Sequence, residues 1–555
     1  MERTGHRTPP AAKHARGACD DAPMNAHGGA LAVAAAQAYG IDTLFTLSGG
    51  HVFPLYDGAV KADPAMRILD VRHEQTAVFA AEAYAKLTRR PGLAVLTAGP
   101  GVTNGVSAVT TGHFNASPLL VLGGRAPAAR WGSGSLQELD HPPILAPVTK
   151  RAATVETTDA IPRAVADALA LALSPRRGPV FLDVPMDVLF SYADADIPQP
   201  AAPAYDTTGD PARVAALIQR AERPVVIAGS DVWYDGAEAA LRTFAEAHQV
   251  PVIANGMGRG CLPADHPLSF SRVRGTAFAG ADLVVVVGTP LDFRLAFGAF
   301  GSAKVVHVVN APSEVARHVT LEEHAAGPLA DVLEVMTADG SHAGWTTALR
   351  AEEEVKRDAE AAQLATDTSP IHPARVYGEL RPRLARDAVV VCDGGDFVSF
   401  AGKYVESYEP GCWLDPGPYG CLGTGLGYAI AARLARPDSQ VVLLLGDGAA
   451  GFSLMDVDTL VRHRLPVVMV CGNNGIWGLE KHPMQFLYGY DVAADLQPEC
   501  RYDEVVRALG GHGELVTDVE QIGPALDRAF ASGLPAMVNV VTDPTVAYPR
   551  TSNLA

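Results

Sequence analysis

Residues 446–478 read GDGAAGFSLMDVDTLVRHRLPVVMVCGNNGIWG. The apolar run VVLLLGDG is typical of a buried strand that ends in a glycine-rich turn, and PVVMVCGNN is typical of the next strand. The segment between them predicts one helix, with Phe452, Met455, Leu460 and Leu465 facing the core. The stretch therefore predicts a strand–helix–strand unit of a parallel sheet.

Asp447 and Asn474 stand where these two predicted strands end. Because the carboxyl ends of neighbouring parallel strands lie side by side, we expect the two side chains to converge. A carboxylate and an amide oxygen are hard ligands that suit Mg²⁺ bridging a bound phosphate group. The glycines allow backbone N–H groups to reach the phosphates, and the following helix contributes its N-terminal dipole.

The composition indicates an ordinary globular protein of about three domains, because 555 residues exceed what one hydrophobic core usually supports. A formal net charge of −18 argues against a nucleic-acid or anionic-membrane partner, which needs a basic surface. No run approaches the roughly 18 apolar residues of a membrane span. We expect an enzyme that acts on a small molecule.

The seven cysteines are scattered and never form a CxxC pair, which favours reduced thiols over a disulfide framework or a zinc site. Residues 1–26 are polar and lack the apolar segment of a secretory signal, so we expect a disordered extension. These features predict a cytoplasmic protein.

Short β-branched runs alternate with helical patches from about residue 30, and the pattern restarts twice. Such alternation predicts α/β domains with parallel sheets. Proline-rich or charged connectors mark the boundaries. We expect three doubly wound parallel-sheet domains and a short tail, at residues 27–195, 209–340, 371–545 and 546–555.

GDG followed after this spacing by NN resembles the signature of thiamine-diphosphate enzymes, and the resemblance covers nearly the whole chain outside the N-terminal tail. It implies thiamine diphosphate and Mg²⁺ as cofactors. The metal would be held by Asp447, the side chain of Asn474 and the backbone carbonyl of Ile476, with Gly448 and Ala449 beside the diphosphate. The three domains would then be pyrimidine-binding, central and diphosphate-binding.

PYGCLGTGLGYAIAARL (418–434) resembles the family segment that receives the aminopyrimidine ring. Gly420 and Leu422 occupy the places that contact the ring and bend the cofactor. A simple glycine-rich helix start is the alternative interpretation.

RHEQTAVFAAE (72–82) places Glu74 between a strand and an alanine-rich helix. An ordinary residue at a helix start is one interpretation. In the family that this motif resembles, the glutamate hydrogen-bonds the pyrimidine nitrogen and promotes loss of the C2 proton. That glutamate reaches a cofactor whose diphosphate lies on the partner subunit, so the resemblance implies at least a homodimer, and we expect a homotetramer.

TAGPGVTNGVSA (97–108) and SLQELDHPPILAPVTK (135–150) resemble acetolactate synthases, in particular actinobacterial large-subunit-like proteins. They are also similar to 2-hydroxyacyl-CoA lyase, oxalyl-CoA decarboxylase and benzaldehyde lyase. The resemblance implies that Pro100 and Asn104 contribute to the cofactor site.

Three polar residues are candidates to face the substrate. Gln137 stands where acetolactate synthases carry the glutamine of an FQE segment, and His51 stands where benzaldehyde lyase carries a histidine. Glu480 lies at the place of a catalytic glutamate in pyruvate-decarboxylase-like enzymes. A carboxylate and an imidazole in a closed pocket could move protons during the reaction. A hydrogen-bonded turn histidine and a surface helix residue are the alternatives for His51 and Glu480.

The central segment VVVVGTPLDFRLAFGAFGSAKVVHVV resembles the FAD-contacting segment of the synthases. Phe293 separates Asp292 from Arg294, and Asn310 stands where an acidic residue is common. FAD and ADP are therefore both candidate ligands, as is part of a CoA substrate. The C-terminal tail resembles segments that close over the site in hydroxyacyl-CoA lyases, with a frayed end as the alternative.

The combined prediction is a carboligase similar to acetolactate synthase, an enzyme of branched-chain amino acid biosynthesis. It would decarboxylate a 2-oxo acid such as pyruvate and add the hydroxyalkyl anion to a second carbonyl. The alternative is a 2-hydroxyacyl-CoA lyase that forms or uses formyl-CoA, or a related 2-oxo acid decarboxylase. A cofactor-binding homologue without turnover is the hypothesis from another class.

Overall fold

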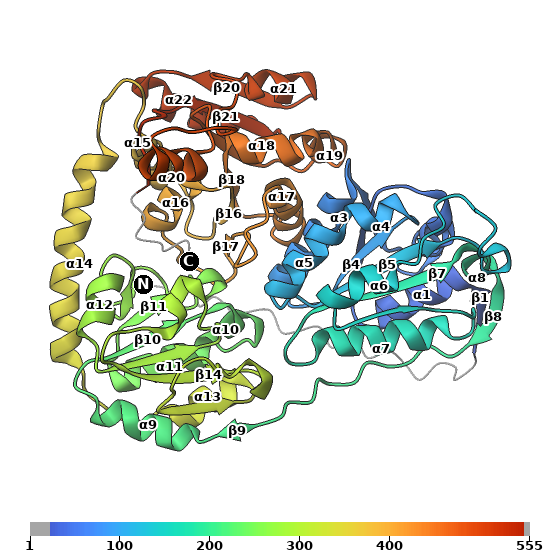
Figure 1. Ribbon diagram of the computed structural model, residues 1–555, viewed down its shortest axis with the longest axis horizontal. Helices are drawn as coiled ribbons and strands as arrows, with labels where there is room; N and C mark the ends of the chain where they lie inside the picture. The colour runs from blue at the N-terminus through green and yellow to red at the C-terminus, as the bar shows by residue number, and fades with distance from the viewer. Residues whose placement is uncertain (1–22, 549–555) are drawn as a thin grey trace, which may run out of the picture.

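The computed structural model describes residues 23–548 and contains three α/β domains (Figure 1). Residues 1–22 and 549–555, which include most of the predicted extension and tail, lie outside the described residues. The predicted extension is wrong at its end, because Met24–His27 form strand β1, which pairs antiparallel with β8 (Tyr192–Ala195).

The N-terminal domain is a six-stranded parallel sheet in the order β3-β2-β4-β5-β7-β6. Alternate strand residues enter two separate apolar clusters, so helices cover both faces. The strands are β2 (Thr43–Thr46), β3 (Arg67–Asp70), β4 (Gly92–Leu96), β5 (Leu119–Arg125), β6 (Arg151–Thr154) and β7 (Pro179–Pro185). The helices are α1 (Gly28–Ala38), α2 (Phe53–Lys61), α3 (Glu74–Thr88), α4 (Pro100–Asn104), α5 (Val106–Phe114), α6 (Pro142–Leu145), α7 (Ile161–Leu173) and α8 (Met186–Phe190).

The central domain has a seven-stranded sheet in the order β12-β11-β10-β13-β14-β15-β9, parallel except for the last pair. The strand order reverses between β10 and β13. The strands are β9 (Thr208–Gly209), β10 (Pro224–Ala228), β11 (Val252–Ala254), β12 (Ser269–Phe270), β13 (Leu283–Val287), β14 (Lys304–Val309) and β15 (Glu323–Ala326). The helices are α9 (Pro211–Arg220), α10 (Ser230–Tyr234), α11 (Glu238–His248), α12 (Arg274–Gly280), α13 (Leu329–Met336) and α14 (Ala343–Leu364).

The C-terminal domain has a parallel sheet in the order β17-β16-β18-β19-β21-β20. The strands are β16 (Val389–Asp393), β17 (Trp413–Leu414), β18 (Val441–Gly446), β19 (Val468–Asn473), β20 (His512–Val516) and β21 (Ala536–Val541). The helices are α15 (Pro373–Leu380), α16 (Asp396–Tyr404), α17 (Thr424–Ala435), α18 (Asp447–Ser453), α19 (Val457–Arg462), α20 (Gly478–Tyr488), α21 (Tyr502–Ala508) and α22 (Val519–Ala531). The predicted fold of three doubly wound domains is confirmed.

The single helix predicted between β18 and β19 is instead broken. Ser453, with φ −139° and ψ 1°, ends α18, and a 3₁₀ turn precedes α19. The break rotates the faces of the segment relative to one continuous helix. Leu460 and Leu465 are buried as expected, but Phe452 and Met455 are 53% and 55% exposed, so their prediction as core residues is wrong.

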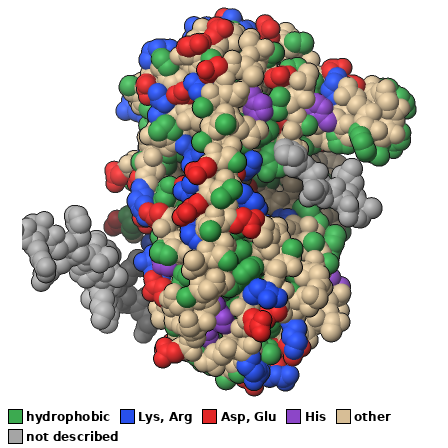
Figure 2. All heavy atoms as spheres, turned by 90° about the vertical axis from the view of Figure 1, so that its left-hand side faces the viewer, with side chains coloured by type: hydrophobic (Ala, Val, Ile, Leu, Met, Phe, Trp, Pro, Cys, Tyr) green, Lys and Arg blue, Asp and Glu red, His purple; other side chains and the backbone are tan. Residues whose placement is uncertain are grey.

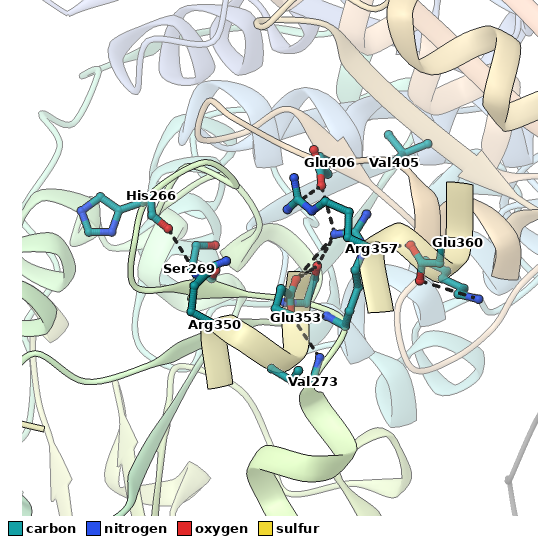
Figure 3. Close-up of polar contacts among 12 residues, drawn as sticks. His266, Ser269, Val273, Arg350, Glu353, Arg357, Glu360, Val405 and Glu406 are labelled. Atoms are coloured by element: carbon teal, nitrogen blue, oxygen red, sulfur yellow. Dashed lines mark hydrogen bonds and ion pairs between the residues drawn. The ribbon is translucent and has the colours of Figure 1, made fainter. Parts of the chain in front are cut away.

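The long helix α14 connects the central and C-terminal domains along the left side of Figure 1. Its Glu353 accepts hydrogen bonds from the backbone N–H groups of Arg272 (2.9 Å) and Val273 (3.1 Å) (Figure 3). The guanidinium of Arg272 contacts Glu360 of α14 at 2.7 Å and Glu406 of the C-terminal domain at 3.0 Å. Burial works to lower the pKa of Arg272, but the three glutamates together raise it above its ordinary value.

Figure 2 shows the face that carries α14, where acidic and basic side chains are interspersed. The net charge of −18 is therefore not gathered into one patch on this face. Within residues 23–548, no helix has the length and apolar character that crossing a membrane requires.

Candidate active site

The GDG and NN turns meet at the carboxyl ends of the neighbouring strands β18 and β19, where Gly446 pairs with Gly472. One carboxylate oxygen of Asp447 accepts a hydrogen bond from the Gly475 N–H at 2.7 Å, and the other accepts from the Gly448 N–H at 3.0 Å. Asn474 immediately precedes Gly475, so the structure brings the two predicted ligand-bearing turns into one corner.

Asp447 is buried at this corner, and burial raises its pKa to about 6, although the N–H groups of Gly475 and Gly448 oppose that rise. A buried carboxylate that lacks a cationic side-chain partner suits a divalent cation. Among residues 23–548, no group of three or more His, Cys, Asp or Glu side chains is arranged to hold a metal. A metal here would thus need the mixed set of Asp447, the Asn474 amide oxygen and the Ile476 carbonyl, which fits Mg²⁺.

The glycines at the GDG turn determine how closely a ligand can approach the backbone. A Cβ atom at Gly448 would lie 2.5 Å from the ring of Trp477, so no side chain fits there. A Cβ at Gly446 would meet no heavy atom of the described chain within 4 Å, so the mouth of the turn is open. Ala449 is buried behind the turn. An open glycine backbone beside the predicted metal ligands would fit a diphosphate group.

Gly420 and Leu422 lie on the loop that precedes α17, and Asp393 fixes the end of that loop. Asp393 accepts hydrogen bonds from the N–H groups of Gly423 (3.1 Å) and Gly425 (2.8 Å), and burial raises its pKa to about 7. Gly420 is exposed with φ +67°, and Leu422 is half-buried. Leu422 is thereby held beside the strand ends.

Glu74 is the first residue of α3 and is buried. Its Oε2 accepts a hydrogen bond from Asn104 Nδ2 at 3.1 Å, and its Oε1 lies 3.7 Å from where a Cβ at Gly101 would stand. Asn104 and the exposed Pro100 belong to the same short helix, α4. The predicted residues Glu74, Pro100 and Asn104 therefore form one cluster.

His51 and Gln137 lie at the same edge of the N-terminal sheet. His51 is buried, and its Nδ1 lies 3.2 Å from Thr97 Oγ1. The pKa of His51 is lowered, chiefly by burial, while the Leu136 carbonyl opposes the change. Gln137 packs over Gly99, where a Cβ would lie 2.9 Å from the Gln137 Cβ. A Cβ at Gly101 would in turn lie 2.6 Å from Thr97, which links this pair to the Glu74 cluster.

Glu480 lies on α20 of the C-terminal domain and is exposed. No hydrogen bond or ion pair between described residues joins its side chain to His51 or Gln137. The chain thus brings three of the four predicted catalytic residues to one sheet edge and leaves the fourth on another domain.

The two halves of the predicted site lie on domains that contact each other through α3 and α17. A Cβ at Gly427 would lie 2.7 Å from the Phe79 Cβ, so these helices pack closely. Within the described residues, no hydrogen bond or ion pair joins Glu74 to Asp447 or Asn474.

Sequence reasoning missed Thr97, Asp393 and Asp456, which hold the predicted site residues in place. Asp456 accepts hydrogen bonds from the backbone N–H of Arg72 (2.8 Å) and from Thr76 Oγ1 (2.6 Å), across two domains. The only available signal was position, since Thr97 and Asp393 each end a predicted strand. Nothing local distinguishes Asp456 from a solvated aspartate.

This fold and this pair of sites define a thiamine-diphosphate-dependent enzyme. The chain belongs to the thiamine pyrophosphate enzyme family: residues 26–144, 211–336 and 393–540 match the family's N-terminal TPP binding domain, central domain and C-terminal TPP binding domain.

Among its relatives is the acetolactate synthase large subunit IlvG of Mycobacterium tuberculosis, 54% identical over 549 residues, which cover 97% of this chain and 100% of the relative. The 2-hydroxyacyl-CoA lyase 2 of Caenorhabditis elegans is 33% identical over 95% of this chain and 91% of its own length. The human 2-hydroxyacyl-CoA lyase 2 is 32% identical over 93% of this chain and 90% of its own length.

Proposed function

We propose that this chain is a carboligase of the acetolactate synthase type, which decarboxylates a 2-oxo acid such as pyruvate and joins the remaining fragment to a second carbonyl compound. The observation that carries the proposal is the 2.7 Å hydrogen bond between Asp447 and the Gly475 N–H. This bond joins the GDG turn to the NN turn, the two turns that we expect to hold the cofactor. The identity of 54% to a mycobacterial acetolactate synthase supports this choice of reaction.

Thiamine diphosphate, when bound, supplies a carbon nucleophile and accepts the electron pair that CO₂ leaves behind. Asp447, Asn474 and Ile476 would hold Mg²⁺ and through it the diphosphate, while Gly420 and Leu422 would contact the pyrimidine ring. The role of this chain at that corner is to bind and orient.

Glu74 would hold a proton next to the pyrimidine nitrogen. Its carboxylate is buried and accepts a hydrogen bond from Asn104 Nδ2, which fixes the orientation of the carboxyl group. Gln137 and His51 would face the substrate carbonyl from the same sheet edge. The contacts of His51 with Thr97 and Leu136 favour a role in shaping the pocket over one in proton transfer.

We propose that the complete site forms between two copies of the chain, at least as a homodimer and in its final form as a homotetramer. We call Glu74 with Asn104 the N-terminal half-site and Asp447 with Asn474 the C-terminal half-site. Within residues 23–548 of a single chain, no hydrogen bond or ion pair joins the two half-sites. Phe452 and Met455 are exposed next to the C-terminal half-site, where apolar side chains are typical of an interface between subunits.

The experiment that tests the reaction supplies the purified protein with thiamine diphosphate, Mg²⁺ and pyruvate. Acetolactate is measured as acetoin after treatment with acid. We expect acetoin to accumulate only with both cofactors present. Absence of acetoin together with cleavage of a 2-hydroxyacyl-CoA to formyl-CoA would overturn the proposal in favour of the lyase.

The lyase is the second candidate because several 2-hydroxyacyl-CoA lyases match more than 90% of the chain at 32–33% identity. The same protein preparation decides between the two activities, since a lyase would release formyl-CoA without consuming pyruvate.

We propose that FAD or ADP binds a cavity of about 400 Å³ between the central domain and the two other domains, which contribute Arg176 and Asp415 to its lining. The cavity lies where the strand order reverses, and it is lined by Ser230 and Asp231 after β10 and by Gly288 and Thr289 after β13. Such switch points are the usual ligand sites of open parallel sheets. A visible absorption spectrum of the purified protein distinguishes flavin from adenine nucleotide.

We also propose a cytoplasmic location. The described cysteines, which exclude Cys19, are all unpaired, in keeping with a reducing compartment. Detection of the protein in a fractionated cell extract tests this.

A further inference from the structure

A buried histidine lies behind the sheet edge that carries Gln137 and His51. Both ring nitrogens of His141 have partners: Nε2 lies 2.9 Å from the Gly99 backbone nitrogen, and Nδ1 lies 2.9 Å from Asp183 Oδ2. The side chains of His141 and Asp183 are both fully buried. The assigned roles of the predicted site leave this histidine unused.

The hydrogen bond from Gly99 fixes where the ring carries its proton. The Gly99 N–H can only donate, so Nε2 must accept and the proton must lie on Nδ1, which donates to Asp183. A buried carboxylate would ordinarily favour a charged histidine. Here Arg125 also donates to Asp183 Oδ2 at 2.9 Å, and Thr154 donates to Oδ1 at 2.6 Å. Arg125 thus supplies the positive charge that pairs with the Asp183 carboxylate.

Gly99 is the residue through which His141 reaches the site. Its φ of +60° lies in the region that favours glycine. A Cβ at Gly99 would lie 2.9 Å from the Gln137 Cβ and 3.1 Å from the Gln137 carbonyl oxygen, so the two backbones are in close contact. Gln137 itself has φ +59°. A shift of Gly99 would therefore displace Gln137.

We propose that His141 is a positioning residue: as a neutral Nδ1–H imidazole held by Asp183, it anchors the Gly99 turn and so fixes Gln137 against the substrate. The proposal rests on the proposed function for the role of Gln137. The anchoring of Gly99 can be measured without any turnover.

The test compares His141→Gln with His141→Leu. Glutamine keeps one acceptor for Gly99 and one donor for Asp183, whereas leucine keeps neither. Amide hydrogen exchange of the peptide around residues 97–101 reports the Gly99 N–H directly, and thiamine diphosphate affinity and steady-state kinetics are measured on the same preparations. If His141→Leu does not fold, Asp183→Asn replaces it, because asparagine can donate to Nδ1 and move the ring proton to Nε2.

We expect Gly99 to exchange about tenfold faster in His141→Leu and at nearly the original rate in His141→Gln. The turnover number should fall about tenfold or more in the leucine variant, recover in the glutamine variant, and leave cofactor affinity unchanged. Unchanged Gly99 exchange in His141→Leu, or equal losses in both variants, overturns the proposal. If the unaltered protein has no activity, the proposed function fails and the exchange data alone decide the role of His141.

Discussion

Thr76 and Asp456, 380 positions apart, share a hydrogen bond of 2.6 Å between the N-terminal and C-terminal domains. Asp456 also accepts from the Arg72 N–H and from Thr459 Oγ1 (2.9 Å). This buried carboxylate therefore fixes the start of α3, two residues from Glu74, against the domain that carries the predicted metal site at Asp447.

Replacing Asp456 by alanine should destabilise the protein, because it leaves buried donors on both domains without an acceptor. We expect a loss of about 2–4 kcal/mol in the free energy of unfolding, measured by urea denaturation. The matched control is Asp458→Asn, which weakens the partly exposed ion pairs with Arg462 and Arg72 and should cost less than about 1 kcal/mol. Equal losses in the two variants would contradict this assignment.

Glu74→Gln should lower the turnover number by about 10²–10⁴-fold, because the amide cannot hold the required proton. Thiamine diphosphate binding, followed by quenching of tryptophan fluorescence, should persist. Glu156→Gln, at an exposed position of the same domain, is the control and should leave turnover intact. A fully active Glu74→Gln enzyme would show that the assigned chemistry is wrong.

Asp447→Asn should raise the Mg²⁺ concentration needed for half-maximal activity by about tenfold or more, since it removes the charged member of the predicted ligand set. Asp438→Asn, in the exposed turn before β18, should have no effect. In the unaltered protein, a chelator should lower the melting temperature of the cofactor-loaded state, because bound ligands stabilise the folded form. Identical Mg²⁺ titrations for Asp447→Asn and Asp438→Asn would exclude Asp447 as a ligand.

Met455→Glu should weaken the proposed dimer, because it places a charge in an exposed apolar position beside the C-terminal half-site. Light scattering after size-exclusion chromatography should show a smaller particle, and activity should fall with it. Val355→Glu, on the exposed face of α14, is the control for added charge. A variant that keeps both its mass and its activity would argue that Met455 lies outside the interface.

Asp393→Asn should change how stability depends on pH. Burial raises the pKa of Asp393 from its ordinary value of 3.8 to about 7 in the folded protein. Between these two pH values, the folded state therefore binds more protons than the unfolded state. The contribution of this group is thus fully present below pH 3.8 and is lost as pH rises through about 7. The melting temperature of the unaltered protein should therefore exceed that of Asp393→Asn by more at pH 5 than at pH 8. A difference that grows toward pH 8 would have the wrong sign.

The family, the three parallel sheets and the meeting of Asp447 with the Asn474 turn could all be predicted from sequence. Apolar runs locate buried strands, and the geometry of a parallel sheet then places the strand ends together. Short edge strands such as β17, with two residues, and β6, which reads RAAT, carry no such signal. The break at Ser453 was equally hidden, because the sequence there still shows helical periodicity.

Local sequence patterns could not predict the residues that act through tertiary contacts. Asp456 and His141 gain their importance from partners far away in the sequence, at Thr76 and at Asp183. Their local surroundings read as an ordinary helix and an ordinary loop. The predicted grouping of Glu480 with His51 stays a prediction, since the two residues lie on different domains of the chain.

The ionic contacts of Arg272 bear on how this enzyme could be recombined with its relatives. One guanidinium bridges Glu353 and Glu360 of α14 and Glu406 of the C-terminal domain, with its side chain 2% exposed. A chimera that exchanges the central domain alone, without these partners, would leave a buried cation or several buried anions without an oppositely charged partner. Recombination junctions should therefore be drawn so that Arg272 and its three glutamates are inherited as one block.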